Sequence, residues 1–151
     1  YRETYMREDL HDYVITIDTL EASVTLDNLH TLHQGVRSYM KKRPRTICMT
    51  HASHFYPQGT NLYFIFIGRF DHVNDYRAFQ AGILDHIQKY GGSLSHHHGI
   101  GRMIAPWIEN HLGKEQMDIL RALKRHFDPH GIMNPGGQLG LDLDPSHVRK
   151  S

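Results

Sequence analysis

The chain has 151 residues, long enough for one ordinary domain, and its 17 lysine and arginine residues nearly balance 16 aspartate and glutamate residues. A formal charge of +1 gives no broad basic field for nucleic acid. The single Cys48 excludes an intramolecular disulfide and cysteine-based zinc sites, and no apolar run reaches the roughly 18 residues of a membrane span.

The chain starts with Tyr1 and shows neither an initiator methionine nor a signal peptide. We therefore expect a fragment of a longer cytoplasmic protein, soluble or peripherally attached to a membrane, with residues 1–151 forming a single domain.

The first half of the chain predicts a strand, a helix and two more strands. Tyr13–Leu20 alternates and is rich in β-branched residues, as strands are. Thr25 is a candidate helix cap, and apolar residues recur at helical spacing from there until Arg43-Pro44 ends the helix. Two further strands are predicted at 45–53 and 61–70, and the turn-forming residues between them predict an antiparallel pair.

The second half begins with a predicted helix at 74–90, which Gly91-Gly92 ends. A short edge strand at Ser93–Ser95 would complete the sheet. Two helices follow, one starting near Pro106 and one at 114–126 that Asp128-Pro129 terminates, and then a tail from Gly136. The order predicts an α+β fold: a ferredoxin-like antiparallel sheet with helices on one face, plus a C-terminal helical segment.

Between Gly91 and Gly101, three adjacent histidines are bracketed by glycine pairs. Glycine frees the backbone, so His96, His97 and His98 can be directed into a concave site, where imidazole acts as acid, base, anion donor or metal ligand. The alternative without a functional role is a purification tag or a solvated loop. The central position and the Gly-Ile-Gly that follows favour a site-building loop.

This stretch also carries a family resemblance. Ser-Leu-Ser-His-His-His-Gly-Ile-Gly, then a tryptophan-bearing helix, then Phe127-Asp-Pro-His-Gly-Ile-Met-Asn-Pro-Gly136 resembles the C-terminal (cap or substrate) part of FAD-linked oxidases of the vanillyl-alcohol oxidase superfamily. Within the superfamily it is most similar to the alkyldihydroxyacetonephosphate synthases, which make ether-lipid precursors. The resemblance runs from about Arg7 to Leu141.

The resemblance implies roles for particular residues. Leu62-Tyr63-Phe64-x-Phe66 matches the strand on which the synthases carry their proton-transferring tyrosine, so Tyr63 takes that role. From the residues alone, a tyrosine that packs on the sheet is the commoner outcome. A phenol with a pKa near 10 needs neighbouring donors to act near neutral pH, and the three histidines are candidates. Among them, His98 is also expected to contact the cofactor.

Arg7 stands at the spacing before Leu20-Glu-Ala-Ser23 at which the synthases carry a substrate-binding arginine, and guanidinium suits phosphate. We expect no resident metal. His51 and His54 are tempting ligands, but in the related D-2-hydroxyacid dehydrogenases two of the ligand positions correspond to Tyr63 and His97 here. Adventitious nickel or zinc binding stays open.

By this resemblance, the chain is the cap part of an FAD-dependent enzyme that exchanges an acyl for an alkyl group on a flavin adduct. An FAD-linked oxidase or dehydrogenase of a 2-hydroxyacid or other alcohol is the alternative, and a stand-alone ferredoxin-like binding module is the second. FAD would be held mainly by a separate N-terminal domain, since this sequence has no glycine-rich phosphate loop. Other expected partners are a small or lipid-like phosphate substrate and no nucleic acid, with homodimerisation left open.

Overall fold

The computed structural model describes residues 9–10, 12–137 and 139–142. The chain divides into two compact units, Tyr1–His96 and His97–Ser151, and each is considered by itself. Arg7, the predicted anion-binding residue, lies outside the described residues.

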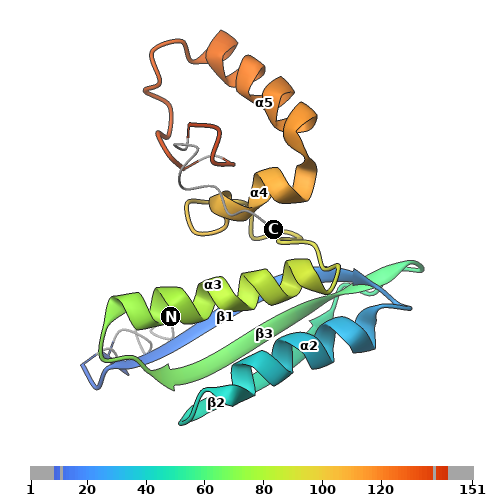
Figure 1. The fold of residues 1–151 in the computed structure, drawn as a ribbon, viewed down its shortest axis with the longest axis vertical. Helices are drawn as coiled ribbons and strands as arrows, with labels where there is room; N and C mark the ends of the chain where they lie inside the picture. The colour runs from blue at the N-terminus through green and yellow to red at the C-terminus, as the bar shows by residue number, and fades with distance from the viewer. Residues whose placement is uncertain (1–8, 11, 138, 143–151) are drawn as a thin grey trace, which may run out of the picture. The chain divides into compact units, whose positions relative to one another are not determined.

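The first unit is an antiparallel sheet with two helices on one face (Figure 1). Its elements in chain order are β1 (Ile15–Thr25), α2 (Leu29–Lys42), β2 (Thr46–Ser53), β3 (Gly59–Arg69) and α3 (Val73–Lys89). The described residues form three strands in the order β1-β3-β2, and both pairings are antiparallel. The predicted α+β class is therefore confirmed.

The core lies between the sheet and the helices. Leu62, Phe64 and Phe66 of β3 are at most 3% exposed, because alternation sends every second side chain of the strand towards α2 and α3. The helices contribute residues at helical spacing: Leu32, Val36, Met40, Phe79, Ile83 and Ile87. Tyr63 therefore lies on the helix-free face.

The turn from β1 into α2 comes later than the sequence predicts. β1 does not end at Leu20 but continues to Thr25, because pairing with β3 extends as far as Gly59. The helix then begins at Leu29, and Thr25 does not cap it. Instead the Thr25 carbonyl accepts a turn hydrogen bond from the Asn28 N–H, and the Asn28 amide donates to the carbonyl of Tyr90 at 2.7 Å.

Gly91 and Gly92 end α3 as predicted. Gly91 has φ +71°, a conformation that favours glycine, and its N–H donates to the carbonyl of Gln88. The Gly92 N–H donates to Ile87 at 2.9 Å, which completes a Schellman motif. A Cβ on Gly92 would come within 2.9 Å of the Ile87 side chain, so this tight exit sets where the histidine loop begins.

The predicted edge strand at Ser93–Ser95 is wrong. The segment follows the free edge of β1, and the N–H of Ser93 donates to Ser23, but no strand forms there in the described structure. Its hydroxyls account for the difference. Ser93 Oγ donates to the carbonyl of Ser95, and Ser95 Oγ donates to the carboxylate of Glu21. Local side-chain bonds thus compete with the sheet ladder.

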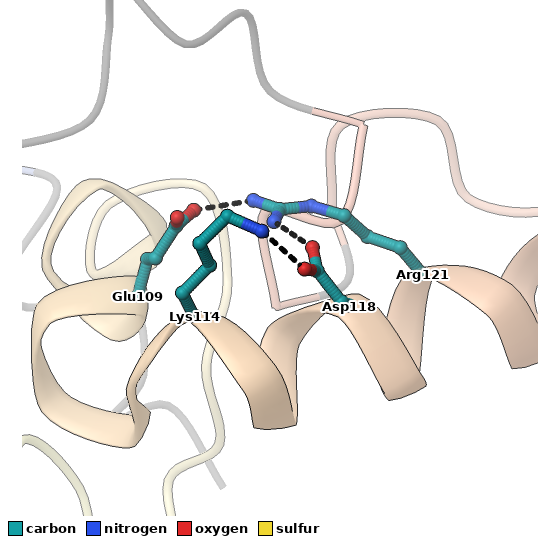
Figure 2. Close-up of polar contacts among 4 residues, drawn as sticks. All are labelled: Glu109, Lys114, Asp118 and Arg121. Carbon is teal, nitrogen blue, oxygen red and sulfur yellow. Dashed lines mark hydrogen bonds and ion pairs between the residues drawn. The ribbon is translucent and has the colours of Figure 1, made fainter.

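The second unit contains α4 (Ala105–Leu112) and α5 (Lys114–Phe127), with Pro106 in the first turn of α4 as predicted. Arg121 of α5 forms ion pairs with Glu109 of α4 and with Asp118 (Figure 2). Asp118 also forms an ion pair with Lys114. The Arg121–Glu109 pair links the two helices. The more exposed Lys114–Asp118 pair contributes little to stability.

In the part of the chain that the structure describes, none of the helices is both long and apolar enough to cross a membrane.

Candidate functional site

A cluster of phenol and imidazole side chains lies where β2 ends and β3 begins. The half-buried Tyr63 points its hydroxyl at Nδ1 of His54, 3.3 Å away. The hydroxyl of Tyr56 lies 3.2 Å from Nε2 of His96. The His54 and His96 rings have centroids 5.1 Å apart, so the two pairs adjoin. His51, opposite Tyr63 in the sheet register, adds a third imidazole, and its ring centroid lies 5.4 Å from that of Tyr63.

His54 is the shared member of this cluster. It follows directly after β2 with φ 54°, a left-handed conformation that is uncommon for residues other than glycine. Its Nδ1 faces two hydroxyls, Ser53 Oγ at 2.8 Å and Tyr63 at 3.3 Å. One ring nitrogen carries either one proton or one lone pair, so these hydroxyls compete for it. His54 can therefore exchange its partner as a proton moves.

A buried carboxylate supports the loop that carries His96. Glu21 is only 3% exposed and lies opposite Tyr63 in the β1–β3 register. Its oxygens accept hydrogen bonds at 2.9 Å from the amide of Asn61, the hydroxyl of Ser95 and the backbone N–H of His96. Because three hydrogen bonds from β3 and from the loop converge on this one carboxyl group, Glu21 fixes the start of the histidine loop on the sheet.

Asn61 leaves one acceptor without a partner. Its side chain is fully buried and donates to Glu21, but Oδ1 has no hydrogen-bond partner among the described residues. Buried polar atoms are normally satisfied, so an orphaned acceptor beside a polar cluster suits a site that receives a donor from a bound molecule or an ordered water.

The structure brings together Tyr63 and His96 of the predicted residues and adds His54, Tyr56 and Glu21. His97 and His98 belong to the second unit, where their rings lie 4.5 Å apart in an edge-on arrangement and both side chains are exposed. The sequence offered one signal for Glu21, a charged residue flanked by the apolar Leu20 and Ala22 within the strand. It offered none for the role of His54.

Chemically, the cluster in the first unit can hold and move protons. Phenol and neutral imidazole groups both donate and accept hydrogen bonds, and imidazole changes charge near neutral pH. The arrangement Tyr63–His54 beside His96–Tyr56 thus offers adjacent groups for general acid–base work on a bound substrate.

Comparison with known proteins identifies the family. Residues 1–137 match the model of the FAD linked oxidases, C-terminal domain. The chain belongs to this family. Most of the described structure, including the tyrosine–histidine cluster and the histidine loop, falls inside the matched range.

Several relatives share this domain. The chain is 36% identical over 144 residues to alkyldihydroxyacetonephosphate synthase of Dictyostelium discoideum, covering 89% of this chain and 23% of that protein. It is 31% identical to the uncharacterized FAD-linked oxidoreductase YgcU of Escherichia coli K12, covering 78% of this chain and 27% of the relative. A solved structure of alkyldihydroxyacetonephosphate synthase matches with a TM-score of 0.61 and 28% identity, covering 89% of this chain and 22% of the other. The chain thus spans about a quarter of the length of these relatives.

Proposed function

We propose that this chain is the substrate-facing part of an FAD-dependent enzyme that makes ether-lipid precursors, as alkyldihydroxyacetonephosphate synthases do. The observation that carries the proposal is the hydrogen bond between Tyr63 and His54, beside the His96–Tyr56 pair. The 36% identity to a synthase over most of the chain supports the choice of reaction.

In this proposal the reaction exchanges one group for another without net oxidation. An acyl-dihydroxyacetone-phosphate releases its fatty acid, and a long-chain alcohol takes the vacated position, so the oxygen and proton of the alcohol balance those of the acid. Tyr63 passes its hydroxyl proton to Nδ1 of His54, and the resulting phenolate takes up the proton at the reacting substrate carbon and later returns it. His54 Nδ1, at 3.3 Å, stabilises whichever form of the phenol is present.

When bound, FAD would supply the redox-active ring on which such an exchange depends. The described residues fit the substrate side of such a ring, because Tyr63, which faces His54, shares a face of β3 with the orphaned acceptor of Asn61. They do not provide a phosphate-cradling loop for the dinucleotide. We therefore propose that an N-terminal domain of the same protein holds most of the FAD, and that this chain covers the reacting end.

The remaining predicted residues complete the proposal. Arg7 would bind the phosphate of the substrate through its guanidinium. His96, His97 and His98 would donate hydrogen bonds to substrate oxygens, with His98 nearest the cofactor. Because the carboxylate of Glu21 accepts a bond from the backbone of His96, this part of the loop is held in place before the substrate arrives.

The test uses the intact flavoprotein and one pair of substrates. With palmitoyl-dihydroxyacetone phosphate and hexadecanol, we expect free palmitate and the alkyl ether in equal amounts, with no electron acceptor consumed. Palmitate release without ether formation, or no reaction with any acyl-dihydroxyacetone phosphate, would rule out the synthase reaction.

An FAD-linked oxidase or dehydrogenase of a 2-hydroxyacid is the second candidate. It is favoured by the 42% identity over 62 residues to glycolate oxidase subunit GlcD of Bacillus subtilis, which covers 41% of this chain. This activity would reduce the flavin with glycolate or D-lactate under anaerobic conditions and would pass electrons to a dye. The synthase reaction would not, so one spectrophotometric assay separates the two.

A further inference from the structure

Positive charge is concentrated in one part of the chain. Residues 28–70 contain six lysine or arginine residues and no aspartate or glutamate, whereas the whole chain has a formal charge of only +1. Five of the six fall between Arg37 and Arg45, at the end of α2 and in the turn that leads to β2. We call Arg37, Lys41, Lys42, Arg43, Arg45 and Arg69 the basic patch.

The turn that carries this charge is fixed by Arg43. Its guanidinium donates to the carbonyl of Arg69 and to Thr46 Oγ1, and it stacks on Phe70 with Cζ 4.0 Å from the ring centroid. These contacts join the start of β2 to the end of β3. Arg43 therefore has a structural role as well as a charge.

The backbone of Arg45 adopts a left-handed conformation that arginine disfavours. It follows Pro44 and has φ 51°, where turns normally use glycine or asparagine. Its side chain is exposed, so packing does not explain the arginine at this position. A backbone held in an unfavourable conformation is grounds for a functional hypothesis.

The turn borders an open cleft of about 660 Å³ lined by Arg43, Pro44, Arg45, Arg69 and Asp71. Asp71 is the single carboxylate in this lining, and it bonds to Arg69. Three guanidinium groups with one carboxylate leave the cleft positive. Guanidinium groups recognise phosphate through paired N–H donors, so phosphate is the ligand chemistry that suits this lining.

We propose that the basic patch binds the phosphate headgroups of an anionic membrane surface. The charges extend from the last two turns of α2 across the cleft, further than one phosphate group reaches, and clusters of four to eight basic residues on an amphipathic helix suit anionic lipids. The inference depends on charge and exposure, and it stands independently of the proposed reaction.

The test is co-sedimentation of the intact protein with vesicles. Binding to vesicles of phosphatidylcholine with 30% phosphatidylserine is compared with binding to phosphatidylcholine alone. We expect binding only to the acidic vesicles, with an affinity that falls as salt is raised. Lys41→Gln with Lys42→Gln should weaken it roughly 25-fold, at about fivefold per basic residue lost.

Two further variants separate charge, position and folding. Arg45→Gly relieves the left-handed backbone, so the melting temperature should stay the same or rise while vesicle binding weakens about fivefold. Lys89→Gln with Arg125→Gln removes the same charge as the lysine pair from exposed positions outside the patch, and it should leave binding within about twofold of the parent.

Equal weakening by the lysine pair and this control pair would overturn the proposal, because net charge alone would then explain the binding. Equal binding to neutral vesicles would also overturn it. So would binding to inorganic phosphate or a DNA duplex without binding to acidic vesicles. Because the readout is sedimentation, failure of this proposal leaves the proposed enzymatic function untouched.

Discussion

The carboxylate of Glu21 joins three segments that are distant in the sequence, and this makes it the most sensitive residue of the site. Glu21→Ala would leave the donors of Asn61, Ser95 and His96 without their acceptor. Since each unsatisfied buried donor costs about 1–3 kcal/mol, we expect the variant to lose about 3 kcal/mol of folding free energy or more. A chemical denaturation curve measures this.

The matched control is Glu21→Gln, which keeps one acceptor oxygen. The new amide group can donate to Asn61 once the Asn61 amide turns over and presents the Oδ1 that now has no partner in the described structure. We expect a loss of about 1 kcal/mol. If the alanine and glutamine variants are equally stable, the three hydrogen bonds do not hold the loop.

Tyr63 provides the test of proton transfer. Tyr63→Phe keeps the ring and the strand but removes the hydroxyl that faces His54, so the free energy of unfolding should change by about 1 kcal/mol or less. Turnover of the intact enzyme should fall by roughly two to four orders of magnitude, the usual contribution of positioned acid–base catalysis. Single-turnover flavin spectroscopy beside a thermal melt measures both. Turnover within about threefold of the parent would remove Tyr63 from the mechanism.

At the residue scale, sequence reasoning found the part of the site that is local in the chain. Strand alternation placed Tyr63 on the face opposite Leu62, Phe64 and Phe66, but it left open which face the helices cover. The role of Tyr63 in proton transfer stays a prediction from the family resemblance. The partnership with His54 depends on how β2 ends against β3, and the contacts of Glu21 depend on where the loop after α3 returns to β1. Both contacts join segments that are far apart in the sequence, and no short motif encodes them. The sequence alone therefore did not predict them.

At the scale of elements, periodicity predicted the type of each helix and strand that the structure describes in the first unit, but it also predicted a strand at Ser93–Ser95 that does not form. The boundaries that failed, at Leu20 and Thr25, were set by pairing with β3 rather than by local propensity. In the second unit α5 is present as predicted, but Leu123 and Phe127 are 51% and 74% exposed, and Met117 is the residue it buries. Helical spacing shows which residues share a face but does not show what covers that face.

The loop after α5 yields a prediction of pH dependence. Asp128 is buried, and its pKa is lowered by the hydrogen bond from Lys124 and further by the N–H groups of Ile132 and Met133. A carboxyl with a depressed folded-state pKa adds stability above its unfolded pKa, near 4, and loses it as the pH falls through the folded value. We expect Asp128→Asn to be less stable than the parent at pH 7, by a margin that shrinks below about pH 4.

Fluorescence of Trp107, the single tryptophan, follows this transition because the residue lies in the second unit and is 5% exposed. Denaturant titrations at pH 7, 5 and 3 give the margin directly. A margin that stays constant down to pH 3 would show that Asp128 acts through neutral hydrogen bonds, without its charge.

At the scale of the whole molecule, the chain supplies groups that can move protons, but its relatives are about four times longer. FAD is a dinucleotide, and tight binding needs donors for its pyrophosphate as well as contacts to its ring. The sequence has no glycine-rich phosphate loop, and our proposal assigns most of the binding free energy to another domain of the protein. We expect the 151-residue chain, shown by circular dichroism to be folded, to bind FAD with a dissociation constant weaker than about 10 μM. That dissociation constant corresponds to a binding free energy of less than about 7 kcal/mol.

Isothermal titration calorimetry measures the dissociation constant, with the intact protein as the positive control. A submicromolar site in the isolated chain would mean that these residues hold the dinucleotide themselves. It would overturn the proposal that another domain of the protein binds most of the FAD.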